Sequence, residues 1–153
     1  MRKYAMLLLR VTIGAVFLYA AYTKLRDPWA LFAMSVDSYK ILPEWAVLAV
    51  ARTLPWFELA LGVVLISGLT LRYASVAAAA LLTVFFTLMI VSYARGLTVD
   101  CGCFGPGEAL GPKTLLRDGT LLSLAIVLAV LAMLPAREIT PRNVTPQKIT
   151  MSV

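Results

Sequence analysis

The sequence predicts an all-α integral membrane protein, a four-helix bundle with an interfacial or re-entrant segment between its first two helices. Of its 153 residues, 61% are hydrophobic and 14% are charged. Soluble domains are roughly 45–50% apolar and about 25% charged. The mean hydropathy is +0.86. The apolar residues fall into four stretches close to the ~20 residues that cross a hydrocarbon core.

The four apolar stretches are expected to form one transmembrane domain over residues 1–134. They cover about residues 4–25, 45–68, 71–94 and 119–134, the last with an interfacial lead-in from Thr114. The second stretch contains Arg52 and Pro55, and proline breaks or kinks a helix. The fourth is short, so we expect it to begin inside the headgroup region.

The segment between the first two stretches, residues 26–43, mixes aromatic and aliphatic side chains with Asp27, Asp37 and Lys40. It is too polar to span a bilayer and too apolar for a free loop. An interfacial amphipathic helix or a re-entrant cap fits this composition.

The two ends of the chain differ in character. The first stretch is expected to remain as a helix rather than to be cleaved as a signal peptide, because Arg10 interrupts it and no small-x-small site follows. Residues 135–153 are polar without an apolar period, so we expect a flexible tail.

The basic residues help to predict the topology. They are evenly divided between the two sides, so their number does not decide the orientation. Arg2 and Lys3 precede the first helix, which usually dominates. We therefore expect both termini in the cytoplasm, with the protein in the inner membrane. The net charge of +6 does not gather into an aromatic-interleaved patch, so membrane lipid rather than nucleic acid is the expected partner.

The two cysteines, Cys101 and Cys103, flank Gly102 in a Gly/Pro-rich loop that this topology places outside the cytoplasm, where disulfides persist. Gly102 lacks a Cβ, so it can turn the two sulfurs toward each other. A disulfide across one residue closes a small, strained and labile ring. So short a loop removes little entropy from the unfolded chain. The pattern therefore favours redox chemistry over structural cross-linking.

Two other readings of the cysteines remain open. Two thiolates can hold Cu(I), whereas zinc needs four ligands and the chain has no histidine. Alternatively, the protein is a small transporter or assembly scaffold in which the cysteines are accessory. In that case the bundle interior carries the function.

Charged side chains within the second stretch are costly in lipid and therefore informative. Glu58 lies near its middle, and Arg10 of the first stretch is a possible ion-pair partner. A structural pair and a functional role, as a proton relay or a hydrogen bond to a quinone headgroup, are both open. Trp56, next to Pro55, stands where an interrupted helix could border a cofactor cavity. Glu58, Arg10 and Trp56 are thus the candidate cofactor-binding residues.

Arg117 and Asp118 open the fourth stretch. An aspartate near a helix N-terminus suits the helix dipole. A guanidinium close to the cysteines would favour the reactive thiolate. The candidate catalytic residues are therefore Cys101, Cys103, Arg117, Asp118 and Asp100.

Several motifs together resemble a known family. They are KLRDP (Lys24–Pro28), YKILP (Tyr39–Pro43), LPWFELALG (Leu54–Gly62), ARGLTVDCGCFG (Ala94–Gly105) and LLRDG (Leu115–Gly119). This order resembles the DoxX-like superfamily, and most closely its MauE-type branch of methylamine-utilisation membrane proteins. The resemblance covers about Arg10 to Leu134, and its most specific part is CGCFG followed by RD.

The resemblance implies a four-helix membrane bundle linked to thiol-disulfide or quinone redox chemistry. MauE-type proteins are associated with disulfide formation in an exported partner enzyme. The bundle is also similar, more distantly, to vitamin K epoxide reductase. This chain has Cys-x-Cys rather than Cys-x-x-Cys and no second pair. A relay would therefore need a partner such as a membrane-anchored thioredoxin-like protein.

We therefore expect a membrane protein whose Cys101–Cys103 pair cycles between dithiol and disulfide. Electrons would pass between an exported thiol protein and a membrane carrier, with quinone as the expected cofactor. One cysteine attacks and the other resolves, while Arg117 and Asp100 tune the pair.

Overall fold

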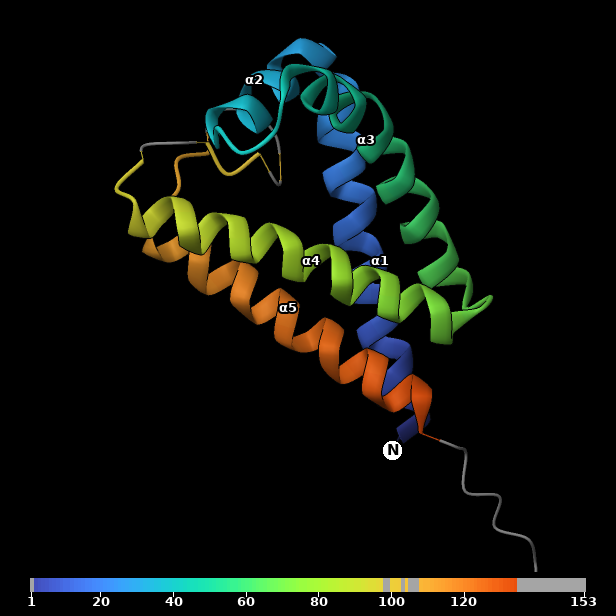
Figure 1. Ribbon diagram of the computed structural model, residues 1–153. Helices are drawn as coiled ribbons and strands as arrows, with labels where there is room; N and C mark the ends of the chain where they lie inside the picture. Colours follow the sequence, from blue (N-terminus) through green and yellow to red (C-terminus); the bar gives the residue numbers. More distant parts are fainter. Residues whose placement is uncertain (1, 98–99, 103, 105–107, 135–153) are drawn as a thin grey trace, which may run out of the picture.

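A computed structural model describes residues 2–97, 100–102, 104 and 108–134 (Figure 1). This part of the chain is all-helical. The helices are α1 (Arg2–Arg26), α2 (Trp29–Ser38), α3 (Glu44–Ser67), α4 (Leu71–Ala94) and α5 (Pro112–Met133). Four of them, α1, α3, α4 and α5, are long and apolar enough to cross a membrane. The predicted fold class is confirmed.

The four predicted spans agree closely with the four long helices. The structure differs from the prediction at Pro55 and at the start of the last helix. Helix α3 is continuous through Pro55, so of the predicted break or kink the break is absent. Neighbouring helices and local adjustments let membrane helices tolerate an internal proline. Helix α5 begins at Pro112, before the predicted lead-in at Thr114. Proline suits the first helical turn because its missing N–H has no partner there.

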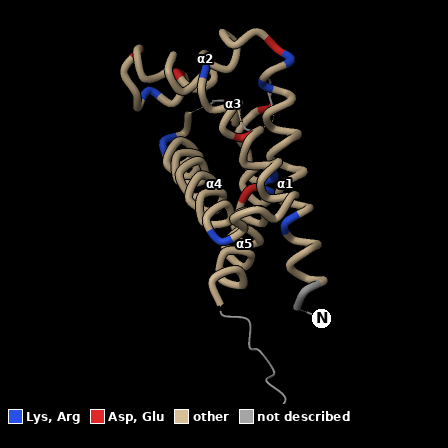
Figure 2. Tube along the Cα trace, turned by 90° about the vertical axis from the view of Figure 1, so that its right-hand side faces the viewer, with Lys and Arg blue, Asp and Glu red and all other residues tan. Residues whose placement is uncertain are grey.

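The long helices form two pairs (Figures 1 and 2). Helix α1 packs along α3, and α4 packs along α5. The two pairs meet where α3 turns into α4, and they diverge toward α2. Helix α2 and the loop between α4 and α5 occupy that open end, whereas the start of α1 and the end of α5 lie at the other. Buried side chains where the pairs meet include Ile13, Phe17, Leu65, Ala78 and Leu128.

The α1–α3 pair is close because glycines face each other across it. A Cβ placed on Gly62 would lie 2.9 Å from the carbonyl oxygen of Gly14. A Cβ on Gly14 would lie 2.6 Å from Cγ1 of Ile66. Small residues at such crossings let helix backbones approach, which is how membrane helices gain packing energy.

Gly62→Val is therefore expected to separate α1 from α3. Valine is a better helix former than glycine, yet overpacking at this contact costs about 1–3 kcal/mol of stability. Unfolding of the detergent-solubilised protein would be followed by loss of helical circular dichroism. The matched control is Ala60→Val on the exposed face of the same helix. Equal stability of the two variants would contradict the close glycine contact.

Candidate functional site

Cys101 is held by the backbone of its own loop. Its N–H donates to the carbonyl of Glu108 at 2.8 Å, and an antiparallel bridge pairs Asp100 with Ala109. The hydroxyl of Tyr39, just after α2, donates to the carbonyl of Cys101 at 3.0 Å. The side chain of Cys101 is 1% exposed. The loop thus carries its cysteine into the protein interior rather than onto the surface.

Gly102 lets the loop lie against α2. Its φ is +68°, in the left-handed region that favours glycine. A Cβ there would lie 3.3 Å from Cβ of Ser35 and 3.7 Å from the ring of Phe32. Both residues belong to α2, so this short helix packs directly against the loop that carries Cys101 and Gly102. The helix predicted between the first two spans is present, and its depth in a membrane stays a prediction.

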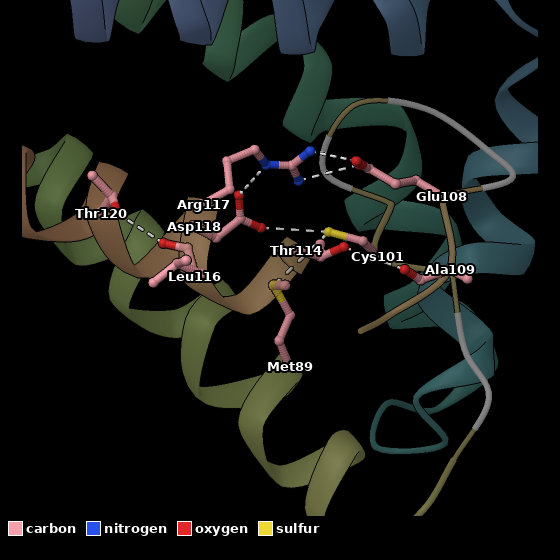
Figure 3. Close-up of polar contacts among 9 residues, drawn as sticks. All are labelled: Met89, Cys101, Glu108, Ala109, Thr114, Leu116, Arg117, Asp118 and Thr120. Atoms are coloured by element: carbon pink, nitrogen blue, oxygen red, sulfur yellow. Dashed lines mark hydrogen bonds and ion pairs between the residues drawn. The ribbon is translucent and has the colours of Figure 1, made fainter. Parts of the chain in front are cut away.

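The sulfur of Cys101 has polar neighbours on α5 and α4 (Figure 3). Its Sγ donates a hydrogen bond to Oδ2 of Asp118 at 3.6 Å. It also lies 3.8 Å from Sδ of Met89. Asp118 is itself 6% exposed. A buried carboxylate beside a thiol can accept the proton that the sulfur gives up when it forms a disulfide.

Arg117 fixes that carboxylate in place. Its Nε donates to Oδ1 of Asp118 at 2.9 Å. Its terminal nitrogens bind both carboxylate oxygens of Glu108 (Figure 3). Its guanidinium lies 4.4 Å from the ring centre of Phe104. The guanidinium therefore reaches Cys101 through Asp118, and not directly as the sequence suggested. Arg117 joins the cysteine loop to α5.

Two residues of the predicted catalytic set remain, Cys103 and Asp100. Cys103 lies outside the described residues, so the separation of the two sulfurs is not part of the structure. Asp100 contributes its backbone to the bridge beside Cys101. The structure thus brings together Cys101, Asp118 and Arg117 of the predicted catalytic set.

A second buried charge cluster lies between α1 and α3. Nζ of Lys24 donates to both carboxylate oxygens of Glu58, at 3.2 and 3.0 Å. The exposed fractions of these side chains are 0% and 6%. Lys24 also lies 5.3 Å from the ring centre of Phe32 on α2. Arg10, the partner suggested from sequence, is not the partner of Glu58.

The other two predicted cofactor residues lie elsewhere. Arg10 packs against the end of α3, where a Cβ on Gly68 would lie 2.0 Å from Nη1 of Arg10. Gly68 has a φ of +75°, so only a glycine leaves this space without strain. Trp56 is 63% exposed and borders an outer pocket with Trp29 and Arg52. Of the predicted set, Glu58 alone borders the interior cavity that also borders Asp118.

The sequence did not predict the contacts that four residues make at these sites, namely Tyr39, Lys24, Glu108 and Met89. Tyr39 and Lys24 stood in quoted motifs but were not given a role. Neither Glu108 nor Met89 was singled out. In the described residues, no group of three Cys, Asp and Glu side chains gathers as a metal site. The contact between Met89 and Cys101 is a soft sulfur pair of the kind that suits Cu(I).

Comparison with known proteins gives one consistent family. The family described as "Methylamine utilisation protein MauE" matches residues 2–131. Methylamine utilization protein MauE of Paracoccus denitrificans is 37% identical over 129 residues, which is 84% of this chain and 69% of that protein. That of Methylorubrum extorquens is 37% identical over 89 residues, 58% of this chain and 47% of that protein. No solved structure matches the chain. The wider DoxX-like relationship stays a prediction from the motifs.

Glu58→Gln is expected to destabilise the bundle by about 3–5 kcal/mol, because it leaves Lys24 buried without its counter-charge. Replacing both residues, Lys24→Met with Glu58→Leu, is expected to restore most of that loss. Denaturant titration of the purified protein, followed by helical circular dichroism, measures both.

The control for this pair is Asp37→Asn, which breaks the exposed pair of Asp37 with Lys40. Exposed pairs contribute about 0.2–1 kcal/mol. A Glu58→Gln variant as stable as Asp37→Asn would show that the buried pair does not hold α1 to α3.

Proposed function

Because this chain belongs to the MauE family of multi-pass methylamine utilisation membrane proteins, we propose that it is a thiol-disulfide redox protein. It passes electrons between an exported thiol protein and a membrane carrier of the quinone class. The observation that carries the proposal is the thiol of Cys101, buried in the interior with a hydrogen-bonded carboxylate beside it. A structural cysteine needs packing, but it does not need a buried Asp118 fixed by an arginine.

The burial of Cys101 suggests different roles for the two cysteines in the exchange. At 1% exposure, Sγ of Cys101 is out of reach of a thiol on another protein. The partner thiolate therefore attacks Cys103, and Cys101 leaves as the second sulfur of the Cys101–Cys103 disulfide. The departing sulfur takes up the proton that the partner's thiol has lost, and the Cys101 thiol so formed donates its hydrogen bond to the carboxylate of Asp118. The partner's second thiol then completes its disulfide, leaving Cys101 and Cys103 as thiols.

Regeneration of the pair runs in the opposite sense. Closing the Cys101–Cys103 disulfide breaks two S–H bonds and forms one S–S bond. Two electrons and two protons pass to the carrier, so a quinone leaves as a hydroquinone. Asp118 takes the proton of Cys101 as its sulfur bonds to Cys103. The exported side of the membrane is the expected location of this exchange, with both termini in the cytoplasm.

Intact cells treated with a membrane-impermeant maleimide are expected to label the protein only after prior reduction, because the resting pair is a disulfide on the exported side. The label is read as a mass shift on the purified chain. The variant Cys101→Ser/Cys103→Ser is the control and acquires no label.

Two outcomes of the labelling would contradict the proposal. Thiols that label without reduction, but only after a Cu(I) chelator is added, would indicate the soft-metal site. Absence of label under both conditions would show that Cys103 is not accessible from the exported side, so that no exported thiol could attack it.

Asp118→Asn is expected to slow disulfide closure roughly 100-fold, at the low end of general-base effects, because the amide keeps the shape but no longer takes the thiol proton. Rapid mixing of the reduced protein with a soluble benzoquinone, followed by acid-quenched alkylation, gives the rate. Asp37→Asn, on the exposed surface, is the control. Equal rates in the two variants would remove Asp118 from the mechanism.

A further inference from the structure

An apolar cavity lies between the two helix pairs, beside the cysteine loop. Its wall comes from α1, α3, α4, α5 and the loop. Helix α1 contributes Val16, Phe17 and Ala20 to the lining. Glu58 of α3, Met89 of α4 and Asp118 of α5 also line the cavity. Phe85, Phe86 and Phe104 complete a lining rich in aromatic rings. The cavity therefore lies in the region where the pairs diverge.

The cavity is adjacent to the redox sulfur. Asp118 and Met89 both line it, and both contact Sγ of Cys101, at 3.6 and 3.8 Å. A molecule in the cavity would thus be separated from the sulfur by one side chain. Arg117 keeps Asp118 in this position from the loop side.

Glu58 and Asp118, both less than one-tenth exposed, are the carboxylates in the apolar wall. Glu58 is held by the ammonium of Lys24, which lies behind it. A wall of this kind suits an apolar ring that carries oxygen atoms able to exchange protons. Water alone is a poor occupant, because apolar cavities tend to stay dry.

We propose that this cavity is the binding site of the membrane carrier and that its ligand is the ring of a benzoquinone. The identity of the ligand rests on the redox function proposed above, whereas the location rests on the geometry. One ring oxygen faces Asp118, which delivers the proton taken from Cys101. The other ring oxygen faces Glu58 and takes the proton lost by Cys103, and the hydroquinone hydroxyl so formed donates a hydrogen bond to the Glu58 carboxylate.

The side chains must adjust for the ring to enter. The free volume of the cavity is about 40 Å³, enough for about three water molecules at ~10–15 Å³ each. Rotation of Phe85 or Phe86 would widen it without moving the helices. Arg10 and Trp56, at the end of α3 and at the outer pocket, take no part in this site.

The test uses the full chain in phosphatidylcholine nanodiscs and a short-tailed azido-benzoquinone as a photolabel. Peptide mass spectrometry is expected to find the label on α1 and α4, near Ala20 and Met89. Ala20→Phe fills the cavity and should lower labelling at least tenfold. Ala15→Phe, on the exposed face of α1, should leave it unchanged. If Ala20→Phe does not fold, Val16→Phe fills the same cavity from one turn away.

Several outcomes would overturn the site. The first is photolabel spread over lipid-facing residues, and the second is an equal loss of labelling in Ala15→Phe and Ala20→Phe. The third is displacement of the photolabel by dodecanol as efficiently as by unlabelled benzoquinone. The last would identify a cavity for acyl chains.

The Cys101→Ser variant separates the site from the redox function. It should bind the photolabel as the unmodified chain does while losing quinone reduction by a dithiol. If the cavity is labelled specifically but the unmodified chain does not reduce quinone with a dithiol, the binding site is supported and the redox function is wrong. If the unmodified chain reduces quinone rapidly but no label is found in the cavity, the redox function is supported and the binding site is wrong.

Discussion

The buried ion pair between Lys24 and Glu58 fixes the geometry on which the rest of the site depends. A carboxylate inside a membrane bundle is tolerated only when it is neutral or paired, and here Lys24 ties the end of α1 to the middle of α3. The same ammonium lies over Phe32, which places α2. The ring of Phe32 in turn meets the backbone at Gly102. One interior charge pair is therefore connected, contact by contact, to the cysteine loop.

The loop is held from two directions that use different chemistry. On the α2 side, the hydroxyl of Tyr39 holds the carbonyl of Cys101, and Gly102 packs without a side chain. On the α5 side, Arg117 joins Glu108 to Asp118. Glycine leaves the backbone at position 102 conformationally free, so these contacts hold the loop at Cys101 and Gly102. Rigid support of this kind is what a redox sulfur needs if its proton acceptor is to stay within reach.

The four spans were predictable because hydropathy is a local property of about twenty residues. Pairing of side chains across helices was not, because it depends on relative depth and rotation. Arg10 and Lys24 are both basic residues of α1, and Lys24 stood in the motif KLRDP near the predicted end of the first span without a role. Its side chain is 0% exposed because it turns inward to Glu58. The role of Glu108 was equally hidden, since its partner Arg117 lies nine positions away across a turn of the chain.

The position of Asp118 also explains why a membrane protein would keep its cysteine so deeply covered. A thiol at the surface meets water, which supplies and removes protons without assistance. Cys101 is 1% exposed, so the proposed mechanism has its proton taken by a group inside the protein, and Asp118 is the carboxylate in hydrogen-bond contact with it. The buried sulfur contacts Met89 and Asp118, and both of these residues line an apolar cavity. In the function proposed above, burial would therefore remove one route for protons and place the sulfur near a carrier that dissolves in lipid.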